Sequence, residues 1–226
     1  MNELVCNHKD INYPKCLKTI ADYPKTIYYM GDLSLLDNSN KIAVIGSRDI
    51  TSRGILVTSN LTHKLVNNDY IIVNGMALGC DTIALETVVK EKKKAVVVLP
   101  CGFDNIQPKS NTSLMKKIIS LGGLVLSEYP NGTSLTKYMY VQRDRLQAAI
   151  ADCIIVVECK VNSGTMHTVN YAIKYMKPVA CFQEPVNTTA NGNQQLIESK
   201  KAYPICDSST LNSFLLNNIY QQISFV

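Results

Sequence analysis

Short runs of β-branched and aliphatic residues recur along this chain, each followed by small polar residues and then by a segment with apolar side chains at helical spacing. The runs are KIAVIG (41–46), YIIVNG (70–75), AVVVLP (95–100), GLVLSE (123–128), CIIVVE (153–158) and PVACF (178–182). Each run is apolar on both faces, which is typical of strands buried between two layers of helices. Strand, loop and helix repeated in this order predict an α/β fold, a Rossmann-like doubly wound and mainly parallel sheet.

The remaining segments complete one globular domain with an extension at each end. Helices are expected at residues 54–67, 81–92, 112–121, 143–151 and 164–176. Residues 1–40 contain two Tyr-Pro pairs and predict a short N-terminal extension, an irregular or helical cap on the sheet edge. The Rossmann-like core is expected over 41–205, with a polar loop at 186–195. Residues 206–226 have apolar residues at roughly helical spacing and predict a C-terminal helical tail.

The composition narrows the class of protein. Hydrophobic residues make up 46% of the 226 residues, as in ordinary globular proteins, and the net charge of +5 is compatible with an anionic partner. The eight cysteines form no C-x-x-C pair and there are three histidines, so reduced thiols and no metal site are expected. No stretch reaches the ~20 apolar residues of a membrane-spanning helix, and the N-terminus has no signal-peptide pattern. We therefore expect a cytoplasmic protein without membrane contact or cofactor.

Three loops carry the strongest functional signal. Ligands of open parallel sheets bind beyond the carboxyl ends of the strands, where helix N-termini present unbonded N–H groups. Glycine lets a backbone approach a phosphate there, while Ser and Arg side chains offer hydrogen-bond donors. The residues of these loops that we expect to cradle phosphates are Gly46, Ser47, Arg48, Asn74, Gly75, Ala77, Gly79, Asp81, Ser163, Gly164 and Thr165. Tight turns with capping residues are the structural alternative for any single loop.

A further loop, expected over residues 131–142, combines cations with aromatic rings. It contains Lys137, Tyr138 and Tyr140 and leads into Arg143 and Arg145. Cations suit the backbone of an unpaired nucleic-acid strand and aromatic rings suit its bases, so Lys137, Tyr140, Arg143 and Arg145 are predicted to bind such a strand. The alternative is an ordinary surface loop whose arginines pair with Asp144 or Asp152. The sequence contains neither G-x-G-x-x-G nor G-x-x-x-x-G-K-[ST], which disfavours NAD-dependent oxidoreductases and ATPases.

Seven motifs together resemble one family. IAVIGSR, NGMALGCDTIAL, VVVLPCGFDNIQPKSN, GLVLSEYP, QRDRLQAAIADCIIVVE, SGTMHTVNYAI and NGNQQLIESKKAYPI are similar, in order and over nearly the whole chain, to the DNA-processing protein A (DprA/Smf) family. The resemblance implies a protein that binds single-stranded DNA, usually as a homodimer, without catalytic turnover. It also implies protection of incoming DNA and help in loading the RecA recombinase during natural transformation.

The resemblance carries over residue by residue, with three departures. The family's G-S-R motif corresponds to residues 46–48, its S-G-x-A-x-G-x-D motif to 74–81, its F-P-x-R-N-R motif to 140–145, and its S-G-[ST] motif to 163–165. Asn74 replaces the usual Ser, Leu85 a common His and Asp144 the usual Asn. The carboxylate of Asp144 is expected either to weaken phosphate contact or to orient the two arginines beside it.

Two other functions remain open from the residues alone. Phosphoribohydrolases with a similar sheet share the signature P-G-G-x-G-T-x-x-E, and here Thr168 stands at the position of that final carboxylate. Glu86 and Glu158 are the remaining candidate acids for a nucleotide-hydrolysing enzyme. A nucleotide-binding sensor that signals through an oligomeric partner is the second alternative.

Overall fold

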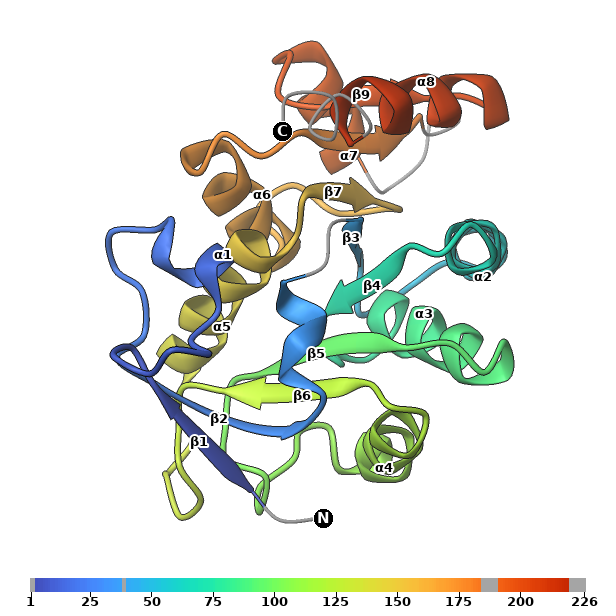
Figure 1. The fold of residues 1–226 in the computed structure, drawn as a ribbon. Helices are drawn as coiled ribbons and strands as arrows, with labels where there is room; N and C mark the ends of the chain where they lie inside the picture. The colour runs from blue at the N-terminus through green and yellow to red at the C-terminus, as the bar shows by residue number, and fades with distance from the viewer. Residues whose placement is uncertain (1–2, 38–39, 184–190, 220–226) are drawn as a thin grey trace.

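The chain folds around one twisted sheet of mainly parallel strands (Figure 1). The computed structural model describes residues 3–37, 40–183 and 191–219. Within these ranges the sheet has nine strands in the order β1-β2-β6-β5-β4-β3-β7-β8-β9. All strand pairs from β6 to β9 in this order are parallel, while β2 runs antiparallel to both β1 and β6. The predicted Rossmann-like α/β fold is confirmed.

The six predicted strands are all present. They are β3 (Lys41–Ile45), β4 (Ile71–Asn74), β5 (Ala95–Leu99), β6 (Leu124–Ser127), β7 (Cys153–Val156) and β8 (Val179–Phe182). Their side chains alternate between two separate hydrophobic clusters: in β3, Ile42 and Val44 pack into one cluster and Ala43 and Ile45 into the other. Burial on both faces is therefore the physical reason why these strands contain so few polar residues.

Helices cover both faces of the sheet (Figure 1). One layer contains α2 (Ser52–Asn67), α3 (Cys80–Lys90), α4 (Thr112–Ser120) and α8 (Ser208–Asn218). The other contains α1 (Lys15–Lys18), α5 (Lys137–Ile150), α6 (Thr165–Lys174) and α7 (Gly192–Glu198). Short 3-10 helices lie at Leu33–Leu36 and Lys109–Asn111. None of the helices in the described ranges has the length and apolar character needed to cross a membrane.

The N-terminal extension is more than a cap, because it adds two strands to the sheet. Strand β2 (Thr26–Gly31) pairs with β6 through register partners such as Tyr28 and Ser127, and β1 (Leu4–Asn7) pairs with β2. The expectation of an irregular or helical cap is therefore wrong for these strands. They lie at the sheet edge and are only partly buried, so they lack the doubly apolar pattern of the central strands. The expected division of the chain at residue 40 stays a prediction.

Two other segments differ from expectation. Helix α5 begins at Lys137, so the loop predicted over 131–142 ends at residue 136, six residues earlier than predicted. At the C-terminal side, α7 occupies part of the predicted polar loop and is followed by a short strand, β9 (Tyr203–Ile205). Residues 184–190 of that loop region and residues 220–226 of the predicted tail lie outside the described residues. Helix α8 agrees with the predicted helical character of the tail up to Asn218.

Candidate functional site

A cavity lies where the winding of the sheet reverses direction. From β3 the chain proceeds outward through β4, β5 and β6, and it then returns to the other side of β3 with β7. The loops that follow β3 and β7 therefore diverge, and ligands of such folds bind in the crevice between them. The cavity has a volume of about 310 Å³. Its walls are formed by Ile45, Gly46, Ser47, Arg48, Asp49, Ala77, Asp81, Arg143, Asp144, Gln147, Lys160, Ser163, Gly164, Thr165 and Thr168.

The cavity brings together most of the residues expected from the sequence. Those that line it are Gly46, Ser47, Arg48, Ala77, Asp81, Arg143, Ser163, Gly164 and Thr165. Those outside its walls are Asn74, Gly75, Gly79, Lys137, Tyr140 and Arg145. Three further residues of the cavity walls were not expected from the sequence to bind a ligand: Gln147, Lys160 and Asp49. Gln147 follows Arg143 by one helical turn, so the spacing of α5 was the signal that could have identified it.

Direct hydrogen bonds hold the two diverging loops together. The Ser47 N–H donates to the carbonyl of Glu158 at 2.8 Å, and the Thr165 hydroxyl donates to the carbonyl of Gly46 at 3.0 Å. The buried carboxylate of Glu158 accepts from the Thr51 N–H at 2.7 Å and from its hydroxyl at 2.6 Å. Glu158 therefore binds the N-terminus of α2, where a carboxylate is stabilised by the helix dipole, and it has no position among the cavity walls.

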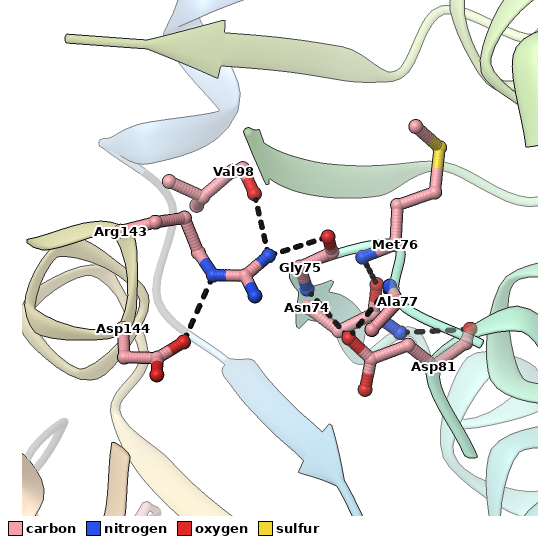
Figure 2. Close-up of polar contacts among 8 residues, drawn as sticks. All are labelled: Asn74, Gly75, Met76, Ala77, Asp81, Val98, Arg143 and Asp144. Carbon is pink, nitrogen blue, oxygen red and sulfur yellow. Dashed lines mark hydrogen bonds and ion pairs between the residues drawn. The ribbon is translucent and has the colours of Figure 1, made fainter. Parts of the chain in front are cut away.

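The loop between β4 and α3 is closed by its own side chains (Figure 2). Asp81 Oδ2 accepts from the N–H groups of Gly75 at 3.1 Å and Ala77 at 3.2 Å. Asn74 Oδ1 accepts from the Met76 N–H, and Asn74 Nδ2 donates to the Asp81 carbonyl, both at 3.1 Å. The backbone donors that we expected to face a phosphate therefore bind these side chains instead. Asp81, the last residue of the 74–81 motif, therefore holds the loop between β4 and α3 in a fixed conformation.

Two of the predicted glycines are explained by close packing. A Cβ atom on Gly75 would lie 1.7 Å from Arg143 Nη1, so only glycine leaves room for that guanidinium. Gly79 has a φ of +73° and its Cβ would lie 2.4 Å from the Ser47 carbonyl oxygen. A side chain there would be strained by both the backbone conformation and the approach of the neighbouring loop.

Arg143 joins three elements beneath the cavity (Figure 2). Its Nε donates to Asp144 Oδ1 at 2.9 Å, and its Nη1 donates to the carbonyls of Gly75 and Val98 at the ends of β4 and β5. The residue is only 5% exposed. Asp144, which departs from the family motif, thus orients Arg143. It was expected to orient Arg145 as well, and no such contact is present among the described residues. Arg143 therefore links α5 to the ends of β4 and β5 through buried hydrogen bonds.

Arg145 points away from the cavity. Its guanidinium donates to Glu128 Oε2 at 2.6 Å and to the Asp22 carbonyl, and the residue is 3% exposed. The open alternative of pairing with an acid is correct, but the acids are Glu128 and Asp22. Lys137 is exposed at the first turn of α5, outside the cavity walls. The Tyr140 ring lies 5.4 Å below the guanidinium of Arg48 at the cavity edge.

Charge is divided unevenly within the cavity. Arg48 and Asp49 are exposed at its edge, where Lys160 Nζ lies 3.4 Å from Asp49 Oδ2 with both side chains largely in solvent. Asp81 and Asp144 are buried in its interior. Burial raises the pKa of Asp144, an effect opposed by the charges of Arg143, His167 and Arg48. Anions are therefore favoured at the edge and disfavoured next to the inner carboxylates.

Two polar atoms among the cavity residues have no hydrogen-bond partner within the described part of the chain. They are Gln147 Nε2, on a residue only 2% exposed, and Ser163 Oγ. An unsatisfied buried donor costs about 1–3 kcal/mol, so such groups in a protein interior usually bind water or a ligand. Together with the carboxylate of Asp144, they offer both a donor and acceptors to a neutral polar group. Among the described residues no cluster of His, Cys, Asp and Glu is placed to hold a metal ion.

Asp81 provides a pH-dependent prediction. Burial raises the pKa of its carboxyl from 3.8 to about 6, although Arg143 and the N–H groups of Ala77 and Gly75 oppose this shift. The folded protein therefore takes up a proton at a pH where the unfolded chain does not, and the cost of the ionised carboxylate disappears as the pH falls from 6 towards 4. Relative to Asp81→Asn, which keeps an acceptor oxygen, the wild type should gain about 1–3 kcal/mol of unfolding free energy between pH 7.5 and pH 4.

Urea unfolding of both proteins across this pH range measures the difference and cancels the contribution of every other titrating group. A difference that stays constant with pH would show that Asp81 titrates normally in the folded state.

Comparisons with known proteins bear on the family and the fold of this chain. The family model for DNA recombination-mediator protein A matches residues 4–215. The DNA processing protein DprA of Bacillus subtilis is 31% identical over 74% of this chain and 56% of its own length. The chain spans about half the length of the curated relatives it matches.

Solved structures extend the comparison to the fold. DNA processing protein A from Helicobacter pylori, whose structure concerns its single-stranded DNA binding mode, superposes with a TM-score of 0.86 at 31% identity, covering 96% of this chain and 97% of that one. DprA from Streptococcus pneumoniae gives a TM-score of 0.83 at 27% identity, covering 93% and 73%. With a family model that matches nearly its whole length and a fold shared with two members, this chain belongs to the DNA recombination-mediator protein A family (DprA/Smf).

Proposed function

We propose that this chain binds single-stranded DNA at the cavity between the loops after β3 and β7, without catalytic turnover. The observation that carries this proposal is the contrast between the edge and the interior of the cavity. Arg48 and Lys160 place cations at the edge, while the interior offers the unpartnered Nε2 of Gln147 beside a buried carboxylate. The similarity of this chain to DNA processing protein A from Helicobacter pylori, which has a described single-stranded DNA binding mode, supports the same ligand.

The edge suits the phosphate backbone. Guanidinium and ammonium groups form charge-assisted hydrogen bonds with phosphates, and Arg48 and Lys160 are the cations of the cavity that reach solvent. The Tyr140 ring beneath Arg48 adds a flat aromatic face at this edge. Lys137, one turn earlier on α5, extends the cationic edge outward.

The interior suits the edge of a base. Asp81 and Asp144 would repel a phosphate, and the N–H groups of the 74–81 loop are already bonded. A nucleobase is neutral and presents hydrogen-bond donors and acceptors together, which match the Asp144 carboxylate and Gln147 Nε2. In a duplex these base edges are paired, so a single strand is the form of DNA that can enter.

Two features argue against a hydrolytic enzyme. Thr168, which lines the cavity, has a hydroxyl where the phosphoribohydrolase signature has a carboxylate. Glu158 is engaged by Thr51 at the start of α2, and Glu86 lies in a separate depression between α3 and α4. Neither glutamate faces the cavity that would hold a substrate.

Membership of the family supports a wider role. We propose a cytoplasmic homodimer that protects incoming single strands and helps load the RecA recombinase during natural transformation and recombination. The similarity to the DprA proteins of Bacillus subtilis and Streptococcus pneumoniae supports this role.

A fluorescence titration tests the central proposal. An oligothymidylate of about 20 nucleotides, the matching duplex and thymidine monophosphate are each titrated with the protein at two salt concentrations. The oligomer should bind much more tightly than the other two, with a log–log salt slope near −3 if about four phosphates are neutralised. Equal affinity for duplex and single strand would contradict the proposal, and tight binding of the mononucleotide alone would favour the nucleotide sensor.

A further inference from the structure

The interior of the cavity is rich in hydrogen-bond acceptors. Asp81 and Asp144 are only 7% and 8% exposed, and both line the cavity. An ionised carboxylate accepts hydrogen bonds but donates none. Although burial raises the pKa of Asp144, the Arg143 guanidinium at 2.9 Å opposes this shift and favours the ionised form. The part of a ligand that lies against these side chains must therefore present N–H or O–H donors.

The carboxylate of Asp144 can accept further hydrogen bonds. Figure 2 shows that its Oδ1 accepts from Arg143 Nε, while the other oxygen points away from the guanidinium. Within the described residues, that second oxygen, Oδ2, accepts no hydrogen bond. Because each carboxylate oxygen has two lone pairs, both oxygens can still accept a hydrogen bond after Arg143 is bound. A ligand with two adjacent N–H donors can therefore bind both oxygens at once.

Gln147 adds a donor beside this carboxylate. It follows Asp144 by three residues on α5, so the two side chains lie on the same face of the helix, and both line the cavity. Gln147 is 2% exposed, and its Nε2 has no hydrogen-bond partner in the part of the chain that the structure describes. A buried amide of this kind is satisfied when it donates to a carbonyl oxygen of a bound ligand.

Guanine is the nucleobase whose Watson–Crick edge fits these two side chains. It presents two adjacent donors, N1–H and the N2 amino group, beside the acceptor O6. In thymine the N3–H group is flanked by two carbonyl acceptors, and in adenine and cytosine the amino group is next to a ring nitrogen that accepts. Those three bases would therefore place an acceptor lone pair against the second oxygen of Asp144. The cavity volume of about 310 Å³ is small for a ligand site, so it suits one base.

We infer that the cavity binds one unpaired guanine in preference to the other bases, with Asp144 accepting from N1–H and the N2 amino group and Gln147 donating to O6. The inference rests on the proposed function, because it assigns the base that the same site reads. A good bidentate contact discriminates against the wrong base by about 5- to 100-fold. The cations at the cavity edge act on phosphates, which all nucleotides share, so the selectivity comes from the interior alone.

Short oligomers that differ in a single base provide the test. End-labelled oligothymidylates of about six nucleotides carry guanine, inosine, adenine, cytosine or thymine at the same internal position, and fluorescence anisotropy at neutral pH measures their affinity for the protein. Inosine keeps N1–H and O6 but lacks the N2 amino group. The guanine oligomer should bind about 5- to 100-fold more tightly than those with thymine, adenine or cytosine. It should bind about 10-fold more tightly than the inosine oligomer, which forms one hydrogen bond fewer with the carboxylate.

Two variants separate the roles of the side chains. Asp144→Asn replaces one acceptor oxygen by an amino donor but keeps an oxygen that can accept from Arg143, so the preference for guanine over inosine should disappear. Gln147→Leu removes the contact with O6, which both bases have, so both oligomers should bind more weakly and the ratio of their affinities should stay the same. Asp69→Asn is the matched control: it removes a carboxylate from an exposed turn before β4, at the opposite end of the strands from the cavity, and should keep the wild-type ratio.

The outcomes distinguish the inference from the proposed function. Equal affinity of the wild type for the guanine and inosine oligomers, or a guanine preference that persists in Asp144→Asn, would overturn the inference and leave the cavity proposal intact. Wild-type affinity of Gln147→Leu for the guanine oligomer would also contradict it. Failure of the wild type to bind any of the five oligomers, or longer single strands, would instead reject the proposed function itself.

Discussion

Arg143→Ala is expected to lower the free energy of unfolding by about 3–5 kcal/mol, because it removes one partner of a buried, hydrogen-bonded charge pair. The change leaves the Asp144 carboxylate without its 2.9 Å partner and the carbonyls of Gly75 and Val98 without their donor. It also removes the positive charge that opposes the raised pKa of Asp81. The glycine at position 75, which exists to admit this guanidinium, would then border a void.

Urea unfolding followed by circular dichroism measures the effect. Lys137→Ala is the matched control, since it removes the same charge from an exposed position on the same helix and should change stability by no more than about 0.5 kcal/mol. If Arg143→Ala unfolds at the same urea concentration as the control, the contacts of Arg143 with β4 and β5 do not stabilise the fold.

The central sheet could be predicted because its chemistry is local. Each of the strands from β3 to β8 is apolar on both faces, and a loop of small residues follows each, so pattern alone located them. Strands β1 and β2 escaped prediction because an antiparallel edge needs only one buried face. The start of α5 was missed for a related reason: Tyr138, Tyr140 and Val141 have low helix propensity, and tertiary packing overrides it.

The position of the candidate site could be predicted, but the tasks of its residues could not. Arg143, Arg145 and Arg48 look alike in the sequence, yet burial divides them into two internal ties and one residue at the solvent edge. The partners that occupy Arg145 are Glu128 and Asp22, and Asp22 is 123 positions away in the chain. Pairing over such a separation follows from the tertiary fold, which no local motif encodes. The binding roles of the individual residues stay predictions.

Because Arg48 is exposed while Arg143 and Arg145 are buried, the largest effect on binding is expected from the exposed cations at the cavity edge. Arg48→Ala combined with Lys160→Ala should weaken binding of an oligothymidylate by about 100-fold at low salt, since two charge-assisted contacts contribute about 3 kcal/mol together. The magnitude of the log–log salt slope should also fall by about 1.4, the single-strand coefficient for two phosphate contacts. Both side chains line the cavity and neither supports the core, so the folded structure should persist.

Lys116→Ala combined with Lys117→Ala is the matched control for this variant. It removes the same charge from exposed positions on α4, which lies in the helical layer on the other side of the sheet from α5 and α6. The log–log salt slope of binding should stay unchanged. If both double variants lower affinity and slope equally, binding depends on net charge alone, and the cavity is not where the strand is held. If only the Arg48 and Lys160 variant lowers affinity and slope, these two solvent-facing cations neutralise phosphates of the bound strand at the cavity edge.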